Sequence, residues 1–307
     1  MQSKNARLGP GAGGRSAHDS TPAQAQALDA IAAAMAARGI APAGGLAELV
    51  ADGHLHRYRV DGDKAGSRAG WCVIHLDGVP AAAFGSWKHG VSDTWRARAP
   101  ASEAERAQHR ERMDAARRQR EAEQARRHQQ AADKAASLWA KARPADPTHP
   151  YLQTKGVPPL KARQLRDSLA LPLYDFDRRL SSLQFIDGGG GKRLLSGGRK
   201  RGCFTPVAGR ADTASRLLLC EGWATGASLH QLDDTALVLA AVDAHNLQPV
   251  AEGARRRWPW LPLVVCADAD PVGERKARAA ALAVGGEVAI PDAGDFNDAV
   301  QAARGEG

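Results

Sequence analysis

The last third of the chain has the most regular alternation of apolar and polar segments. Short, largely apolar runs occupy 217–220, 235–242, 261–267 and 287–291. Stretches of helix-forming composition separate them, at 224–231, 246–257 and 273–284. Buried strands that alternate with helices are typical of a parallel sheet covered on both faces. The pattern therefore predicts an α/β domain over 211–307, Rossmann-like, with a four-stranded, mainly parallel sheet.

The first hundred residues have a different pattern. Residues 1–20 are polar and glycine-rich, which predicts a disordered tail. A helix is predicted from Thr21 and Pro22, a pair suited to a helix start, as far as Gly39, which is suited to a stop. Alternating segments follow, with a hairpin signal at Asp77-Gly78. Residues 21–100 therefore read as a small α+β module.

Two further segments connect this module to the α/β domain. Residues 101–143 contain a long run without glycine or proline, rich in Ala, Arg, Glu and Gln, and predict a long basic helix or linker. Its large apolar residues come at the end, as Leu138 and Trp139, which we expect to anchor it. Residues 144–210 mix helix-like and strand-like pieces and form a predicted basic subdomain.

Charge is distributed very unevenly along the chain. The 307 residues carry a net charge of +8, which by itself indicates a polyanionic partner only weakly. Residues 178–210 hold eight basic side chains and one acidic one, whereas residues 211–307 hold fourteen acidic and eight basic side chains. A basic segment next to an acidic domain suits a protein that holds phosphates and also binds a divalent metal.

Acidic residues directly follow the apolar runs of the predicted sheet. Glu221 follows the first run, Asp268 and Asp270 follow the third, and Asp295 and Asp298 lie in the last loop. Functional residues in open α/β sheets gather at the carboxyl ends of the strands. Mutually repelling carboxylates at that edge predict a site for Mg²⁺ or Mn²⁺. The alternative for any single Asp after a strand is a helix N-cap.

Three motifs in this domain resemble a known family. EGWATG at 221–226, ADAD at 267–270 and GDFNDAV at 294–300 resemble the Toprim domain, in the variant found in plasmid-borne and phage-borne DNA primases. HPYLQTKGV at 149–157 and KRLLSGGRKRGCF at 192–204 resemble the primase-core segment that precedes Toprim in those proteins. Residues 52–90 resemble an N-terminal module of mobile-element primases.

The resemblance implies a DNA primase that makes short RNA primers on single-stranded DNA from NTPs, using Mg²⁺ or Mn²⁺. It implies catalytic and metal-binding roles for Glu221, Asp268 and Asp270, with Asp298 and Asp295 as further acids near the metal. It also implies contacts with template phosphates or the nucleotide for a basic group, namely Lys192, Arg193, Arg199, Lys200 and Arg201. The expected setting is cytoplasmic, without a membrane span, with a separate replicative helicase.

The chain departs from cellular bacterial primases at two points. Thr225 stands where they carry an Asp, and no zinc ribbon is visible. Cys72 and His75 with His54 and His56 offer zinc ligands, but ordinary packing is the preferred interpretation because Cys72 and His75 fall on opposite faces of a strand. Trp71, Trp87 and Trp95 are either core residues or a surface on which bases stack.

Two other functions remain open for the same residues. A Toprim metal-dependent nuclease would use the same acids, and a non-catalytic accessory protein would bind single-stranded DNA without them. The run GGGGKR at 188–193 lacks the spacing of a nucleotide-binding P-loop, so a glycine turn that presents basic residues is the better interpretation.

Overall fold

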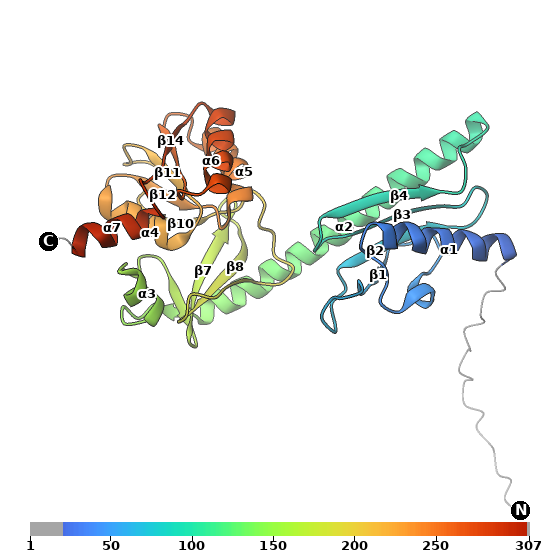
Figure 1. Ribbon diagram of the computed structural model, residues 1–307, viewed down its shortest axis with the longest axis horizontal. Coiled ribbons are helices and arrows are strands. Elements are labelled where there is room, and N and C mark those ends of the chain that lie inside the picture. Colours follow the sequence, from blue (N-terminus) through green and yellow to red (C-terminus); the bar gives the residue numbers. More distant parts are fainter. Residues whose placement is uncertain (1–20, 306–307) are drawn as a thin grey trace, which may run out of the picture. The chain divides into compact units, whose positions relative to one another are not determined.

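The computed structural model describes residues 21–305 and divides into two compact units, which meet between Glu123 and Gln124. The division falls inside α2 (Glu103–Lys141), the helix predicted from the stretch without glycine or proline (Figure 1). The segment predicted to be a disordered tail, residues 1–20, lies outside the described residues. The two units are described separately below.

Unit 1 is built on a four-stranded antiparallel sheet in the order β1-β2-β3-β4. The strands are β1 (His56–Tyr58), β2 (Gly70–His75), β3 (Ala81–Ser86) and β4 (Val91–Arg96), with a short helix η1 (Gly45–Glu48) before them. Side chains alternate along β2, so Cys72 and Ile74 pack under α1 (Pro22–Ala37), while Trp71 and Val73 face Ala116 of α2. Both faces of the sheet are therefore covered by a helix.

The ends of α1 follow from local chemistry. The Thr21 hydroxyl accepts a hydrogen bond from the Gln24 amide, and the Gln24 side chain accepts one from the Thr21 amide, which makes a capping box. Gly39 takes the left-handed conformation with φ +68°, which a side chain would disfavour. The predicted start and stop of this helix are confirmed.

The zinc and base-stacking alternatives for unit 1 find no support in the packing. Cys72 is fully buried in the core under α1. Trp71 is 2% exposed and lies 6.0 Å from the ring of Trp87 beneath α2, with the Arg120 guanidinium 5.5 Å above it. The tryptophans at 71 and 87 are therefore packing residues, and Trp95 also packs against the core.

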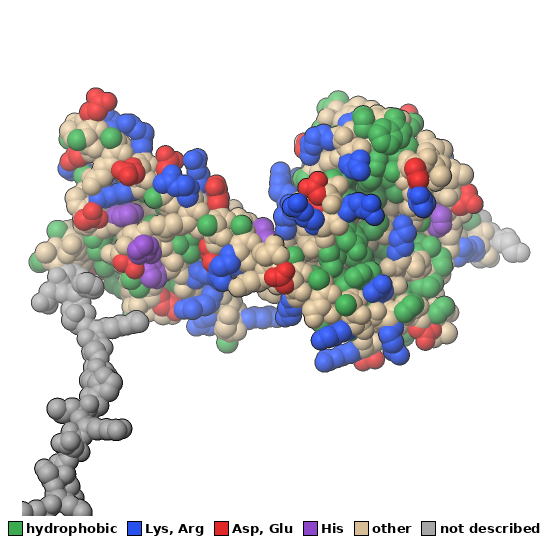
Figure 2. Space-filling model, turned by 180° about the vertical axis from the view of Figure 1, so that it is seen from behind, with side chains coloured by type: hydrophobic (Ala, Val, Ile, Leu, Met, Phe, Trp, Pro, Cys, Tyr) green, Lys and Arg blue, Asp and Glu red, His purple; other side chains and the backbone are tan. Residues whose placement is uncertain are grey.

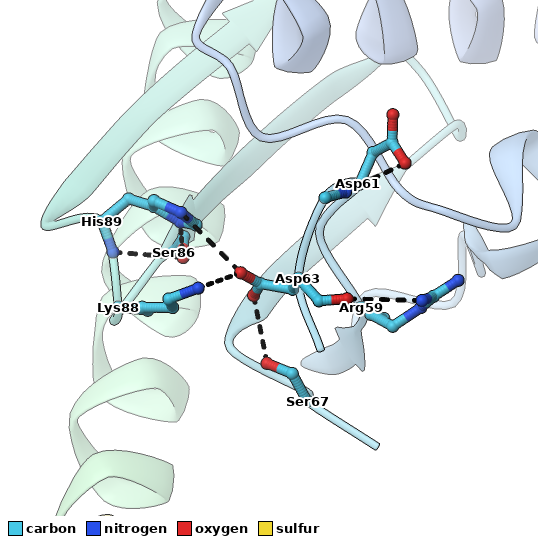
Figure 3. A network of polar contacts seen from close by, with 8 residues as sticks. Arg59, Asp61, Asp63, Ser67, Ser86, Lys88 and His89 are labelled. Atoms are coloured by element: carbon cyan, nitrogen blue, oxygen red, sulfur yellow. Dashed lines mark hydrogen bonds and ion pairs between the residues drawn. The ribbon is translucent and has the colours of Figure 1, made fainter. Parts of the chain in front are cut away.

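A buried carboxylate joins the loop after β1 to the β3–β4 turn (Figure 3). The side chain of Asp63 is 2% exposed and accepts hydrogen bonds from Lys88 and from the Ser67 hydroxyl at 3.0 Å. His89 lies 3.9 Å from the same carboxylate and shares a 2.8 Å hydrogen bond with Ser86. Ser86 is itself 1% exposed, so this Ser-His-Asp arrangement stabilises a turn and offers no accessible nucleophile.

Asp63 should make unit 1 sensitive to acid. The hydrogen bond from Lys88, helped by Ser67, lowers the pKa of Asp63. An acid with a lowered pKa in the folded state contributes stability above its unfolded pKa of about 4, and that stability is lost as the pH falls through the folded value. We therefore expect Asp63→Asn to be less stable than wild type at neutral pH, with a smaller further loss on acidification. Urea unfolding between about pH 6 and pH 3 would contradict this if both proteins showed the same pH dependence.

Unit 2 begins with a second antiparallel sheet in the order β5-β6-β7-β8-β9. Its elements are β5 (Arg143–Pro144), α3 (Pro150–Lys155), β6 (Arg163–Leu165), β7 (Ser168–Tyr174), β8 (Leu180–Asp187) and β9 (Lys192–Leu194). One face packs on the end of α2, where Leu138 and Trp139 join Leu183 and Phe185 as expected from the sequence. The other face packs on α3 and on helix α4 (Trp223–Leu232) of the following domain, because Leu169 and Ile186 share a core with Tyr151 and Trp223.

The last part of unit 2 is the predicted α/β domain. Its sheet has the order β10-β12-β11-β13-β14, and its elements are β10 (Thr205–Ala208), β11 (Leu217–Cys220), α4 (Trp223–Leu232), β12 (Leu237–Ala240), η2 (Ala244–Asn246), α5 (Leu247–Arg257), β13 (Leu263–Cys266), α6 (Pro271–Val284), β14 (Glu287–Ala289) and α7 (Phe296–Gly305). The four predicted strands are parallel neighbours, and β10 adds a fifth, antiparallel strand at the edge. Helices α4 and α7 pack together, as do α5 and α6, and the two pairs cover opposite faces.

No helix within residues 21–305 combines the length and apolar character that a membrane span requires. The longest, α2, is charged along its whole length.

Candidate active site

The site lies where strands β11 and β13 end side by side. Cys220 and Cys266 are register partners in these parallel strands. Glu221 follows β11 directly, and Asp268 stands two residues after β13. Because both strands end at the same edge of the sheet, these carboxylates are brought together there.

The pKa values of Glu221 and Asp268 show how crowded this edge is with negative charge. Burial raises the pKa of Glu221, and the carboxylates of Asp268, Asp243 and Asp270 raise it further. Burial likewise raises the pKa of Asp268, with additional contributions from Asp295, Asp270 and Asp298. The other four acids named from the sequence therefore lie within electrostatic range of Asp268.

Two of these acids also cap helices, and a third bonds to one of the caps. Asp270 Oδ1 accepts hydrogen bonds from the amides of Val272 and Gly273, both at 2.9 Å, at the start of α6. Asp295 Oδ1 accepts from the amides of Asn297 at 2.7 Å and Asp298 at 2.9 Å. Asp298 Oδ2 accepts in return from the Asp295 amide at 3.2 Å. The N-cap alternative thus holds for Asp270 and Asp295, and in each carboxylate the second oxygen takes no part in these bonds.

The donor set at this edge fits a hard divalent cation. Asp268 Oδ1 is buried without a hydrogen-bond partner, which is costly unless another positive group satisfies it. Within residues 21–305, the Glu221 carboxylate makes neither a hydrogen bond nor an ion pair. Among residues 21–305, no three His, Cys, Asp or Glu side chains are grouped closely enough to hold a metal ion as they stand. Carboxylate oxygens are the ligands that Mg²⁺ and Mn²⁺ prefer.

A glycine turn between β8 and β9 brings one lysine to the acids. Asp187 Oδ1 accepts hydrogen bonds from the amides of Gly189 at 3.1 Å and Gly191 at 2.8 Å, and Gly190 has φ +86°. Lys192 follows, and its Nζ lies 3.9 Å from the position that a Cβ would occupy on Gly222. The charge of Lys192 lowers the pKa values of both Glu221 and Asp268, which places it beside them.

The other four basic residues named from the sequence have other surroundings. The Arg193 guanidinium stacks 4.8 Å from the Phe185 ring. Arg199 donates to Asp175 at 2.6 Å and to Ser181 at 3.3 Å.

Lys200 forms an ion pair with Asp243, whereas Arg201 is exposed at a separate small cavity beside His245 and Lys276. Of the five basic residues, Lys192 is the one that lowers the pKa values of both Glu221 and Asp268.

Asp243 is a further acid at this edge that sequence analysis missed. It lies three residues after β12, raises the pKa of Glu221, and has a buried Oδ1 without a partner. Val242, just before it, has φ +79°, a strained conformation for a β-branched residue. The signal was present, because Asp243 follows the apolar run at 235–242 as the other acids follow theirs.

Asn246 joins the two loops that carry Asp243 and Lys200. Its side chain is buried, with 2% of the residue exposed. Nδ2 donates to the carbonyls of Lys200 at 3.1 Å, Cys203 at 2.8 Å and Ala241 at 2.8 Å, and Oδ1 accepts from the Gly202 amide at 2.8 Å. This one side chain therefore ties the basic segment to the end of β12.

Replacing Asn246 should destabilise the fold strongly. Asn246→Ala leaves a buried amide and several carbonyls without partners, and we expect a loss of about 2–4 kcal/mol in the free energy of unfolding. Gln248→Ala, an exposed change on α5, is the matched control. Urea unfolding of both variants tests this; a loss below about 0.5 kcal/mol for Asn246→Ala would contradict the structural role.

Asn297 has a comparable role in the GDFNDAV motif. It is fully buried, and its Nδ2 donates to the Lys155 carbonyl at 2.6 Å and to the Ser228 hydroxyl at 2.9 Å. These bonds join α7 to α3 and α4. Gly226 serves close packing, since a Cβ there would lie 2.9 Å from Val207 and 3.0 Å from Cys220 Sγ.

Residues 216–306 match the family model described as a Toprim domain, and the parallel sheet described above agrees with that match. Over a longer stretch, the chain is similar to two curated proteins named DNA primase TraC from Escherichia coli. One is 34% identical over 279 residues, which are 86% of this chain and 26% of the relative; the other is 33% identical over 258 residues, 79% and 18% respectively. The chain thus spans about a quarter or less of the length of these relatives.

The chain also has a partial likeness to solved structures of primases. The primase fragment of the bacteriophage T7 primase-helicase protein is 12% identical, with a TM-score of 0.41, over 52% of this chain and 72% of that one. A DNA primase domain from Pseudomonas aeruginosa is 18% identical, with a TM-score of 0.35, over 46% and 48% respectively.

Proposed function

We propose that this chain is the catalytic part of a DNA primase of a mobile element, which joins NTPs into short RNA primers on a single-stranded DNA template. The observation that carries the proposal is the edge of the Toprim sheet, where Glu221 and Asp268 face Lys192. The similarity to DNA primase TraC over 86% of the chain supports the choice of reaction.

Each residue at the edge has a proposed task. Glu221 and Asp268 hold Mg²⁺ or Mn²⁺, and the free oxygens of Asp270, Asp295 and Asp298 complete the negative field around it. When bound, the metal supplies charge neutralisation for the triphosphate and activates the primer 3′-hydroxyl. The ion pair with Lys200 fixes the position of Asp243, which adds further negative charge near the metal.

Lys192, which lies beside Glu221 and Asp268, provides positive charge for the triphosphate. It also lines a cavity of about 260 Å³ together with Tyr151, Lys155 and the backbone of Gly188–Gly190. Two lysines and glycine backbone are suited to phosphate oxygens. We propose this cavity as the place where the incoming nucleotide is held next to the acids.

A primer-synthesis assay tests the function. Purified chain is incubated with single-stranded DNA templates, labelled NTPs and Mg²⁺ or Mn²⁺, and short RNA products are resolved on a gel. Products that require template, NTPs and metal together support the proposal. Degradation of DNA with metal but without NTPs would instead indicate a nuclease.

A third outcome is possible in the same experiment. DNA binding that is indifferent to chelators, with neither synthesis nor degradation, would indicate an accessory single-strand-binding protein. Because the relatives are several times longer, the assay is run with and without a separate replicative helicase, which we propose as a partner.

A further inference from the structure

An apolar cavity of about 780 Å³ opens on unit 2 away from the catalytic edge. On the face of the Toprim sheet covered by α5 and α6, these helices pack against β11, β13 and β14. The cavity lies beside β10 and β12, the two strands at the opposite edge of the sheet from β14. We call it the aromatic basin, and its apolar wall consists of Tyr174, Phe204, Leu237, Leu239, Trp258 and Trp260.

The basin presents aromatic rings to solvent. Trp260 is 63% exposed and comes three residues after the end of α5. Trp258 is half-buried and is held edge-on to Phe176 at 5.7 Å, and Phe176 in turn lies 4.7 Å from Phe204. A large indole left in water beside a rigid aromatic cluster is a platform for a flat apolar partner.

The rim of the basin is positively charged. Its two acids are already paired, Asp175 with Arg199 and Asp212 with Arg210. Arg178 and Arg257 also line it, and within residues 21–305 their guanidinium groups make neither a hydrogen bond nor an ion pair. Figure 2 shows hydrophobic surface bordered by Lys and Arg side chains on this unit.

We propose that the aromatic basin binds single-stranded nucleic acid, with unpaired bases on Trp260 and Trp258 and backbone phosphates on Arg178 and Arg257. Aromatic rings inside a cationic groove bind single strands with little sequence preference, because every base has a flat face to stack. Duplex DNA fits less well, since its bases are not available for stacking. Within the proposed primase, the basin holds the template strand outside the catalytic edge, so this role rests on the proposed function.

The test measures binding apart from catalysis. Fluorescence anisotropy with a labelled oligo-dT is recorded on the full chain in a chelator, without NTPs. We expect Trp260→Ala to weaken binding roughly 5- to 100-fold, and Trp260→Phe to retain most of the affinity. Because Trp260 is largely exposed, its removal leaves the fold intact, which thermal unfolding checks.

The charged rim is tested by a matched pair on α5. Arg257→Gln should reduce the slope of log affinity against log salt by about 0.7. Its neighbour Arg256, which is exposed but does not line the basin, serves as the control: Arg256→Gln should leave the slope within error of wild type. Cross-linking with oligo-dT that carries photoreactive bases should label residues 258–260.

The proposal is overturned if Trp260→Ala and Arg257→Gln both bind the oligonucleotide like wild type and no cross-link maps to the basin. It is also overturned if an acidic peptide ending in an aromatic residue binds wild type but not Trp260→Ala, while oligonucleotide binding is unchanged; the basin would then dock a protein. If the wild-type chain makes no primers but Trp260→Ala still weakens oligonucleotide binding, the binding role of the basin is supported and the proposed function is contradicted.

Discussion

Asp268→Asn should abolish primer synthesis while making the protein more stable. The substitution keeps the shape of the side chain but removes the charge of a half-buried carboxylate whose buried Oδ1 has no partner. We expect primer synthesis to fall by at least about 100-fold, because groups that stabilise charge in the transition state have effects of that size. Steady-state synthesis on one template, with Asp234→Asn as an exposed acidic control, measures the loss.

The stability of the same variant has a predicted sign. The pKa of Asp268 is raised in the folded protein by burial and by neighbouring carboxylates. An acid with a raised folded pKa destabilises the fold once the pH exceeds its unfolded value, so the metal-free wild type should lose stability as the pH rises through the unfolded and folded pKa values. Asp268→Asn should unfold at a higher urea concentration than wild type at pH 7, with chelator present. Equal activity, or a lower midpoint, would contradict the role assigned to Asp268.

Lys192→Gln should have the second-largest effect on activity. This lysine acts on both Glu221 and Asp268 and also lines the cavity proposed for the nucleotide. Removing a charge-assisted contact to a phosphate costs about 1.5–3 kcal/mol, so we expect a loss of roughly 10- to 150-fold in kcat/KM for the NTP. Lys134→Gln, an exposed change on α2, is the control.

Two features of the Lys192 variant distinguish a direct role from a structural one. The KM for the NTP should rise more than kcat falls, because the contact is already made in the bound state. Oligonucleotide binding without NTPs should change little. An unchanged KM together with strongly weakened DNA binding would indicate that Lys192 contacts the template and not the nucleotide.

The predictable parts of this protein are those set by neighbours in sequence. Thr21, Pro22 and Gln24 determine the start of α1 through their own hydrogen bonds. The apolar runs in the last third become β11 to β14 because a fully apolar short run is stable only when both faces of the strand are buried. Acids placed directly after such runs could be assigned to one sheet edge for the same reason.

Other parts depended on contacts between distant segments. The five basic residues are close in sequence but have different partners in the fold. Arg199 is bound by Asp175, Lys200 by Asp243, and Arg193 lies over the ring of Phe185. Asp243 follows its apolar run as the other acids follow theirs, but its effect on the pKa of Glu221 depends on the pairing of β12 with β11. The antiparallel strand β10 was likewise missed, since its pairing with β12 is a choice between segments about thirty residues apart.

The sequence by itself determined the α/β domain, its strand-end acids and the helix boundaries, because periodicity and capping act over a few residues. Only the tertiary structure decided that Lys192 is the cation at the acids, that Asn246 ties two loops together, and that Trp258 and Trp260 border a cationic basin. These arrangements arise when separate strands and turns pack, and their free energy comes from contacts between segments far apart in the chain.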